Sequence, residues 1–388
     1  MPVKNRMAEL LPEITAWRHD FHENPEIGYE VHRTAGKVAE LLRGFGADEV
    51  VEGVGRTGVV GVIRGRTDGS GRVIGLRADM DALPITERTG VAYASRSPGA
   101  MHACGHDGHT AMLLGAAKYL AETRNFDGTA VVIFQPAEEG GGGGLAMIED
   151  GLAERWGIQE FYGLHNMPGL PTGSFAIREG AMMAAADQLE IVVTGKGSHA
   201  AKPNDGIDTL LISAQMIVAL QSIVSRNVNP LKSAVVSVCT IHTDSTASNV
   251  IPEVVRMKGT ARSLDPDVRE MIEPSMRRVC EGIAAAHGGA VDLIFERGYP
   301  VTMNAPEATL HAAEVARAVS GEVDMSVDPM MASEDFSYML NARPGAYIFL
   351  GNGDTAMLHH PAYNFDDDAI PAGSSWLAGM VEARMPVA

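Results

Sequence analysis

The sequence predicts an α/β protein with two domains, the first built on a mainly parallel sheet that helices flank. Short apolar runs bounded by glycine alternate with segments in which apolar residues recur at helical spacing. Continuous apolar runs are typical of parallel strands buried on both faces. The 388 residues also exceed what one hydrophobic core usually supports, which favours two domains.

The amino-terminal half supplies these helices and strands in order. Leu10, Ile14 and Trp17 share one face of a helix expected over residues 5–20, and a second helix begins at Thr34. The remaining elements are strands at 58–63, 72–77, 130–134 and 161–165 and a helix at 109–122. In sheets of this kind, sites form in loops beyond the carboxyl ends of strands. The side chains in such positions are Asp79, Glu138, Glu139 and His165.

The pattern changes at residue 187, where a second set of elements begins. These are a strand at 188–195, a helix at 208–224, strands at 233–243 and 254–262, a helix at 266–287 and a strand at 290–296. This β-α-β-β-α-β order is typical of ferredoxin-like domains, so we expect residues 187–297 to be inserted into the first domain. The first domain then resumes with a helix at 306–319, a strand at 346–351 and a helix at 371–384.

Charge and composition restrict the partners. The formal charge of −18 at pH 7 repels phosphate backbones, which argues against nucleic acid as a partner. Three widely spaced cysteines favour a reducing compartment. The amino-terminal segment carries charges among its apolar residues, unlike a signal peptide, and we expect no apolar run long enough to span a bilayer. The expected location is therefore the cytoplasm, without binding to nucleic acid or membrane.

Cys104 and His106 place a thiol and an imidazole two residues apart. Residues with this spacing do not share a helix face, so they converge only from a turn, which Gly105 permits. A thiolate and an imidazole together suit a borderline-soft ion such as zinc, cobalt or nickel. A buried free cysteine beside a capping histidine is the alternative that this motif alone leaves open.

Two adjacent glutamates, Glu138 and Glu139, directly follow the strand expected at 130–134. Carboxylates at a sheet end are costly unless water, cations or a metal compensates their charge. Hydrolytic metal sites need one carboxylate as a ligand and another to accept a proton from water. The glycines at 140–144 would let the backbone approach the ions. The alternative is a solvated acidic turn, but flexible linkers rarely separate a buried strand from an immediately following helix.

Histidines at strand and loop ends complete a possible ligand set. His165 closes the strand expected at 161–165, and His359 and His360 precede a proline in a loop. Each histidine alone is more often structural. Together with Cys104 and the glutamates they supply enough ligands for a two-metal centre.

Nine segments along nearly the whole chain carry a resemblance to a known family. They are RADMDALP (77–84), MHACGHDGHT (101–110), FQPAEEGGGG (134–143), GLHN (163–166), GKGSHAAKPNDGIDT (195–209), SNVIPE (248–253), GTAR (259–262), SEDF (333–336) and LHHPAYNFDDD (358–368). The chain resembles the metal-dependent amidohydrolases: hippurate hydrolases, auxin-conjugate (IAA-amino acid) hydrolases and bacterial N-acyl-amino acid deacylases, a branch of the metallo-aminoacylase/carboxypeptidase superfamily. The resemblance implies a catalytic metal-binding domain at residues 1–186 and 298–388, and an inserted lid or dimerisation domain at 187–297.

The resemblance also implies roles for individual residues. Two divalent ions per subunit (Zn, Mn, Co or Ni) would be held by Cys104, His106, Glu139, His165 and His359. Glu138 would be the general base, and we expect Asp79 to orient a ligand. His360 occupies a variable position of the motif, and we expect Asp81 and His109 to be structural or supporting.

Three residues of the inserted domain are expected to contact substrate. By resemblance, His199 stabilises the oxyanion, in many relatives from the partner subunit, and Asn249 and Arg262 bind the substrate's carbonyl or carboxylate. A surface ion pair is the alternative for Arg262. The predicted assembly is a homodimer or homotetramer formed through the inserted domain.

The predicted reaction is hydrolysis of the amide bond of a small-molecule N-acyl amino acid by metal-activated water. The alternative enzyme is a metallo-dipeptidase or carboxypeptidase acting on short peptides, although the Cys104 motif favours the amidohydrolase branch. A metal-binding protein without its base is disfavoured because both Glu138 and Glu139 are present. A phosphoesterase would need a cluster of cations near the site, and none is evident.

Overall fold

The computed structural model describes residues 3–387, which divide into two compact units. The first unit contains the described residues up to Met182, together with Thr302–Asp328 and those from Asp335 onward. The second unit contains Met183–Val301 and Pro329–Glu334. The metal-binding motifs of the sequence all fall in the first unit.

An 8-stranded mixed sheet forms the centre of the first unit, in the order β1-β2-β4-β3-β5-β16-β6-β15. Its strands are β1 (Glu49–Val54), β2 (Gly58–Arg64), β3 (Val73–Asp79), β4 (Thr129–Gln135), β5 (Glu160–Met167), β6 (Phe175–Ala176), β15 (Val323–Asp324) and β16 (Gly345–Gly351). The neighbours β4, β3, β5 and β16 are parallel, as the sequence predicts. By contrast, β1 is antiparallel to β2 and β2 is antiparallel to β4, because the connections from β1 to β2 and from β2 to β3 contain no crossover helix.

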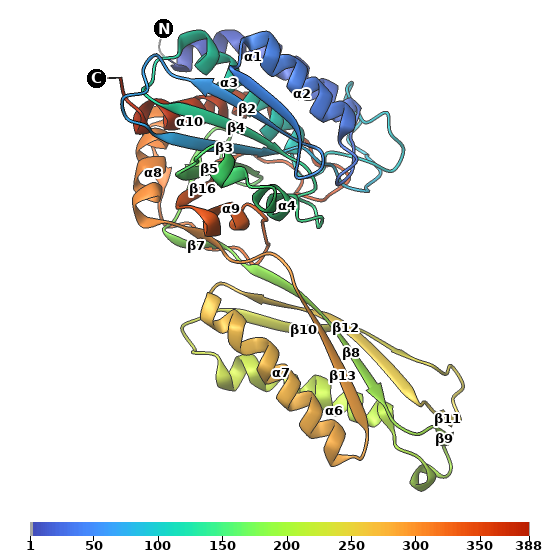
Figure 1. Cartoon of the computed structure of the whole chain (residues 1–388). Coiled ribbons are helices and arrows are strands. Elements are labelled where there is room, and N and C mark those ends of the chain that lie inside the picture. Colours follow the sequence, from blue (N-terminus) through green and yellow to red (C-terminus); the bar gives the residue numbers. More distant parts are fainter. Residues whose placement is uncertain (1–2, 388) are drawn as a thin grey trace. The chain divides into compact units, whose positions relative to one another are not determined.

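Helices cover both faces of this sheet (Figure 1). One face carries α1 (Val3–Glu23), α2 (His32–Phe45), α3 (His106–Thr123), α8 (Pro306–Ser320) and α10 (Ile370–Arg384). The other carries the short helices α4 (Gly143–Glu149) and α9 (Ser337–Ala342), with α5 (Leu152–Arg155) following α4. The largest buried side chain, Trp376 of α10, donates its indole N–H to the carbonyl oxygen of Ala312 in α8. This cover explains why the central strands are apolar on both faces.

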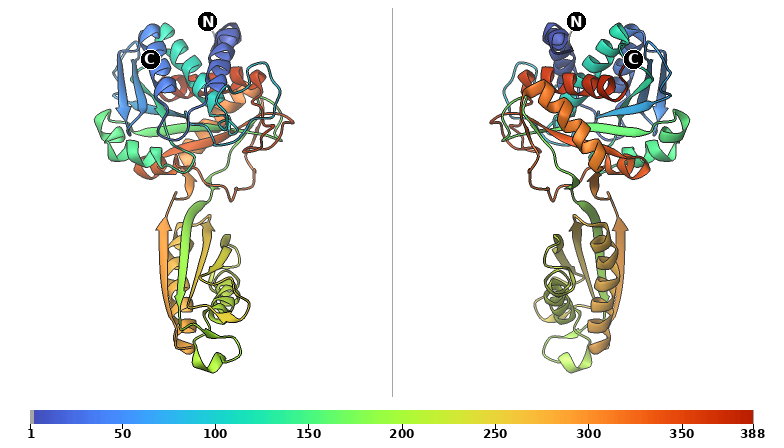
Figure 2. Two further views of the ribbon diagram at one scale, coloured as in Figure 1. Left: turned by 90° about the vertical axis from the view of Figure 1, so that its right-hand side faces the viewer. Right: turned by 90° about the vertical axis from the view of Figure 1, so that its left-hand side faces the viewer.

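The second unit has the expected β-α-β-β-α-β order. Its antiparallel sheet runs β10-β12-β8-β13, and α6 and α7 lie together on one face of it (Figures 1 and 2). The elements are β8 (Ala185–Thr194), α6 (Thr209–Ser222), β10 (Ala234–Thr243), β12 (Val254–Ser263), α7 (Pro266–Ala286) and β13 (Ala290–Arg297). That this unit serves as a lid or dimerisation domain stays a prediction.

Short strands that periodicity did not reveal complete both units. The pair β9 (Ser198–His199) and β11 (Val250–Ile251) forms an arm of the second unit, while β7 (Gly180–Met183) pairs with β14 (Thr302–Asn304). Strands of two to four residues are too short to show an apolar period.

One helical stretch of the second unit departs from the expectation about membranes. Residues Thr209–Asn227, α6 with the π turn Ile223–Asn227, are long and apolar enough to cross a bilayer by length and composition alone. One face of the helix packs into the unit's own core through Ile212, Met216 and Leu220. Leu210, Leu211 and Val218 on other faces are exposed.

Candidate metal centre

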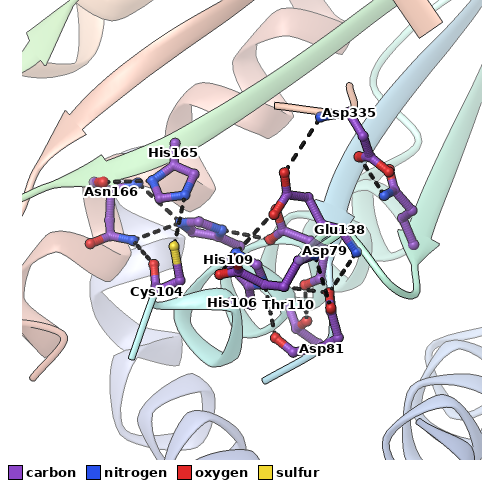
Figure 3. A network of polar contacts seen from close by, with 12 residues as sticks. Asp79, Asp81, Cys104, His106, His109, Thr110, Glu138, His165, Asn166 and Asp335 are labelled. Atoms are coloured by element: carbon purple, nitrogen blue, oxygen red, sulfur yellow. Dashed lines mark hydrogen bonds and ion pairs between the residues drawn. The ribbon is translucent and has the colours of Figure 1, made fainter. Parts of the chain in front are cut away.

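A sharp turn brings Cys104 and His106 together at the start of α3. Gly105 has φ of 88°, and a Cβ there would lie 2.3 Å from Nδ2 of Asn166, so only glycine fits this turn. Cys104 Sγ lies 3.5 Å from Nε2 of His165 at the end of β5. The turn predicted from the Cys-Gly-His spacing is therefore confirmed, and it directs the thiol toward the neighbouring strand end (Figure 3).

Cys104, His106 and His165 form a cluster of possible metal ligands. Its two histidines present the same ring nitrogen to its centre. Nδ1 of His106 donates to the carbonyl oxygen of Asp81 at 2.8 Å, and Nδ1 of His165 donates to that of Asn166 at 2.7 Å. Carbonyl oxygens only accept, so the Nδ1 atoms carry the protons and the Nε2 atoms face the cluster. Among the residues that the structure describes, buried Nε2 of His106 has no hydrogen-bond partner.

The two glutamates both face the cluster because the chain bends immediately after β4. Ala137 has φ of 52°, and the N–H of Gly140 donates to the carbonyl oxygen of Glu138 at 2.6 Å. On a continuing strand, adjacent side chains would point to opposite faces of the sheet. Here the ligand atoms of His106, Glu138 and Glu139 all lie within 4.8 Å of one another.

His359 closes the cluster from a loop late in the chain. Its backbone φ is 62°, and its N–H donates to the carbonyl oxygen of Ala103 at 2.8 Å, which ties it to the Cys104 turn. Its Nε2 lies 3.2 Å from Oε1 of Glu139. His360 points elsewhere: its Nδ1 accepts the N–H of Ala362, 3.1 Å away.

Asp81 holds the glutamate turn with both oxygens of its carboxylate. Oδ1 accepts the backbone N–H of Glu138 at 2.9 Å, and Oδ2 accepts that of Glu139 at 3.1 Å. Because its carbonyl oxygen also accepts from Nδ1 of His106, one buried residue fixes three members of the cluster. We expected Asp81 to be structural; it is a support in direct contact with the site.

Asp79 belongs to a second buried network behind the cluster. Its carboxylate accepts from Nη1 of Arg77 at 2.8 Å and from Nδ1 of His109 at 2.7 Å. Nε2 of His109 in turn accepts the backbone N–H of Asn166 at 3.0 Å. Both ring nitrogens of His109 are thus occupied, which makes it a support for Asn166 rather than a ligand.

The carboxylates and imidazoles of the cluster shift one another's protonation. Burial lowers the pKa of His106, but Asp79 and Asp81 outweigh it and raise the value to about 10. Burial raises the pKa of Glu139, yet His359 and His106 bring it below its usual range. Burial and the nearby glutamates raise the pKa of the Cys104 thiol well above its usual range. The protein alone therefore keeps Cys104 neutral, and a thiolate there requires added positive charge.

These residues fit divalent metal. Cys104, His106 and His165 form one group of closely spaced ligand atoms, and Cys104, Glu139 and His359 form another. Buried Nε2 of His106 has no hydrogen-bond partner among the described residues and lies 3.6 Å from Oδ2 of Asp79 and 4.0 Å from Oε1 of Glu139. A cation would compensate these carboxylates. Binding of metal at these groups would displace protons from Cys104 and His106, as ligand binding to metal generally requires.

Two glycines of the run after Glu139 are required by packing, a reason that the sequence does not suggest. A Cβ on Gly143 would lie 1.7 Å from the carbonyl oxygen of Pro136, and one on Gly144 would lie 2.7 Å from that of Asp335. These two glycines therefore allow the start of α4 to pack closely against the backbone of Pro136 and Asp335.

Three predicted site residues lie in the second unit. His199 pairs with Val250 across the β9–β11 arm, and the N–H of Ala200 donates to the carbonyl oxygen of Asn249 at 2.9 Å. Arg262 lies at the far end of β12, where Nη1 contacts Oγ of Ser333 at 3.1 Å. The surface ion pair considered for Arg262 is absent among the described residues of this structure.

Sequence reasoning missed residues that hold the cluster through hydrogen bonds between distant positions. Asn166 donates to the carbonyl oxygen of Cys104 at 2.6 Å and accepts from the hydroxyl of Tyr363 at 2.6 Å. Asp335 donates its backbone N–H to Oε1 of Glu138 at 3.4 Å. The motifs GLHN, SEDF and LHHPAYNF contain these residues, but spacing alone does not reveal their partners.

Metal-dependent hydrolases typically combine metal ligands with a free carboxylate. The thiol, the imidazoles and the two carboxylates near the carboxyl ends of the parallel strands match this class. Comparison with known proteins agrees with this class. Residues 75–383 match the model of Peptidase family M20/M25/M40. The chain therefore belongs to this family.

Individual relatives match over almost the full length. Hippurate hydrolase of Campylobacter jejuni is 44% identical over 373 residues, covering 95% of this chain and 96% of the relative. Thermostable carboxypeptidase 2 of Saccharolobus solfataricus is 41% identical over 382 residues, covering 96% and 95%. The crystal structure of a Bacillus subtilis dinuclear metal binding peptidase from the M20 family has a TM-score of 0.86 and 33% identity, covering 97% and 99%.

Proposed function

We propose that this protein hydrolyses the amide bond of N-acyl amino acids, using two divalent metal ions. The observation that carries the proposal is the bend that turns both Glu138 and Glu139 toward the Nε2 atom of His106. The proposed metal ligands are Cys104, His106, Glu139, His165 and His359. The similarity to a hippurate hydrolase and to a dinuclear metal binding peptidase supports both the reaction and the number of ions.

Bound metal would lower the pKa of water and polarise the amide carbonyl. Glu138 accepts the proton of the attacking water and passes it to the leaving amine nitrogen. Asp81 fixes the backbone of this base, and Asp79 holds His109 and, through it, the turn at Asn166. The thiolate and imidazole ligands favour zinc, cobalt or nickel, while manganese suits the carboxylate ligand.

The second unit is proposed to supply the contacts to substrate. Nδ1 of His199 accepts the N–H of Ala201 at 3.1 Å, so the proton resides on Nε2, where it can be donated to an oxyanion. The guanidinium of Arg262 suits a carboxylate because its fork donates two parallel hydrogen bonds. Asn249, beside His199 in the arm, is proposed to bind the substrate carbonyl.

The geometry of the second unit supports a shared site in a homodimer or homotetramer. Arg262 and Val254 stand at opposite ends of β12, which at about 3.3 Å per residue places them about 26 Å apart. His199 lies beyond the Val254 end. A small N-acyl amino acid spans about 10 Å, so Arg262 and His199 of one chain do not reach the same molecule. His199 and Asn249 are therefore proposed to act on the substrate of a partner subunit.

The exposed apolar residues of α6 support the same assembly. Leu211 and Val218 are exposed on a helix whose other side packs into the unit's core. A second copy would cover them. All three cysteines are free thiols, which fits the proposed cytoplasmic location.

One experiment tests the reaction. Purified protein loaded with zinc, manganese, cobalt or nickel in turn is assayed for amine release from N-acetyl and N-benzoyl amino acids and from matched dipeptides. The proposal expects faster release from the acyl amino acids. The similarity to a carboxypeptidase supports the alternative of short peptides, which faster cleavage of dipeptides would establish instead.

A further inference from the structure

The SEDF segment (residues 333–336) has no part in the mechanism above, yet Asp335 is wholly buried beside the proposed base. Its backbone N–H donates to Oε1 of Glu138, 197 positions away in the chain. Figure 3 shows this contact on the side of Glu138 remote from Asp81. Asp81 holds the backbone of the base, whereas the contact from Asp335 reaches its carboxylate.

Three groups from three segments fix the side chain of Asp335. Nη2 of Arg77 in β3 donates to Oδ1 at 3.0 Å, and Nε2 of Gln135 in β4 donates to the same oxygen at 2.7 Å. The N–H of Gly144 in α4 donates to Oδ2 at 2.7 Å. A buried carboxylate with an arginine and two further donors is held in one place, because the loss of any donor leaves charge uncompensated.

Asp335 lies where the chain passes between the two units. Pro329–Glu334 belong to the second unit, and Asp335 is the first residue after the chain returns to the first. Its N–H therefore belongs to the peptide group at which the chain passes from the second unit to the first. Anchoring the Asp335 carboxylate to β3, β4 and α4 fixes that N–H relative to Glu138.

We propose that Asp335 is a positioning residue for Glu138: its anchored backbone N–H orients the carboxylate of the base. This inference rests on the proposed role of Glu138 as the base. Asp335 is not among the proposed metal ligands. In Asp335→Asn the side-chain NH2 group would face another donor, either the N–H of Gly144 or Nη2 of Arg77. This repulsion would displace the loop that carries the backbone N–H of residue 335.

The test compares Asp335→Asn with Asp187→Asn. Asp187 is a matched control because it is also a buried carboxylate that accepts from an arginine, Arg269, and from a glycine N–H, that of Gly298. We expect Asp335→Asn to lower kcat by about 100-fold, as misplaced catalytic groups do, with KM and bound metal unchanged. Asp187→Asn should leave kcat of the folded protein within about twofold of wild type.

A double-mutant cycle separates positioning from general damage. If Asp335 acts through Glu138, adding Asp335→Asn to a Glu138→Gln variant lowers the residual rate by less than about threefold. Losses that multiply would overturn the proposal. A fully active Glu138→Gln variant would instead refute the proposed base. If Glu138→Gln is slow and Asp335→Asn has the kcat of wild type, only the positioning role is refuted.

Hydrogen exchange gives a readout that needs neither metal nor turnover. In the metal-free protein, Glu138→Ala removes the acceptor of the Asp335 N–H, so the amide of residue 335 should exchange at least about tenfold faster. Asp187→Asn should leave that amide unchanged. An exchange rate in Glu138→Ala equal to that of wild type would show that the contact does not hold Glu138 in solution.

Discussion

The candidate metal centre of the first unit and the β9–β11 arm of the second hold the side chains proposed to function there in different ways. In the centre, buried hydrogen bonds from distant segments fix Cys104, His106 and Glu138. In the arm, His199 and Asn249 are exposed, and the arm is held by backbone pairing. Metal ligands need fixed geometry before the ion arrives, whereas groups that contact a substrate can complete their surroundings when a second chain and the substrate are present.

The largest effect expected in the centre comes from Glu138→Gln. The amide cannot accept a proton, so kcat should fall by about 10³-fold, within the range that general bases contribute. Metal content should stay at the wild-type value because Glu138 is not a proposed ligand. Turnover measured alongside elemental analysis checks both statements, and near-normal turnover would remove Glu138 from its role.

The arm can be tested against the centre by mixing inactive subunits. His199→Ala should lower kcat by about 10²–10³-fold, as loss of an oxyanion donor does. When it is mixed with Glu138→Gln and the subunits are allowed to exchange, half of the dimers are hybrids, and one of the two sites in each hybrid is intact. Activity should return to about a quarter of the wild-type value. A mixture no more active than its components would place His199 in the same chain as its metal centre.

A smaller effect on kcat and metal affinity is expected when the hydrogen bonds from Asp81 to the glutamate turn are weakened. In Asp81→Asn only one oxygen remains to accept from the Glu138 and Glu139 N–H groups, and the amide donor opposes the other N–H. We expect kcat to fall by about 10-fold to 100-fold and metal affinity to weaken by a similar factor. Metal titration and steady-state kinetics measure these quantities. An unchanged metal affinity would show that the carboxylate clamp is dispensable.

The smallest effect is expected on the pH dependence of stability. It comes from a buried group formed by Arg18, His22 and Asp107. Nδ1 of His22 lies 2.8 Å from Oδ2 of Asp107, which also accepts from Arg18. Burial lowers the pKa of His22, but Asp107 and Glu87 raise it to about 9. The folded-state pKa is above the unfolded value, so this stabilisation is complete below about pH 6.5 and is lost as pH rises through about 9.

The shift corresponds to at most about 3 kcal/mol of unfolding free energy. Denaturant unfolding of wild type and His22→Gln at about pH 6 and about pH 9.5 measures it. The difference in unfolding free energy between the two proteins should be larger at the lower pH. A difference that is constant with pH would show that His22 is not charged in the folded protein.

Much of this comparison was visible in the sequence because it rests on local patterns. Apolar runs gave β3, β4 and β5 within a few residues, and the position of Glu138 after a strand placed it at the sheet edge. The Cys-Gly-His spacing required a turn, and Gly105 adopts it. What local patterns reveal is therefore which residues reach the edge of the sheet.

The remainder depends on pairings across long stretches of chain. The antiparallel pairing of β2 with β4 follows from the absence of a crossover helix between β2 and β3, because β3 is parallel to β4. An apolar run does not encode this direction. The clamps by Asp81 and Asp335 join residues 57 and 197 positions apart. A carboxylate looks the same in sequence whether it is a proposed metal ligand, accepts backbone N–H groups or pairs with arginine. Glu139, Asp81 and Asp335 are the respective examples.

Metal content tests the central claim most directly, namely that the first unit holds a two-ion hydrolytic centre with Cys104 as a ligand. Elemental analysis after metal loading compares wild type, Glu138→Gln and Cys104→Ala, with thermal unfolding to confirm that each variant is folded. The account predicts two ions per chain in wild type and in Glu138→Gln, and fewer in Cys104→Ala. A folded Cys104→Ala protein that still holds two ions per chain would contradict it.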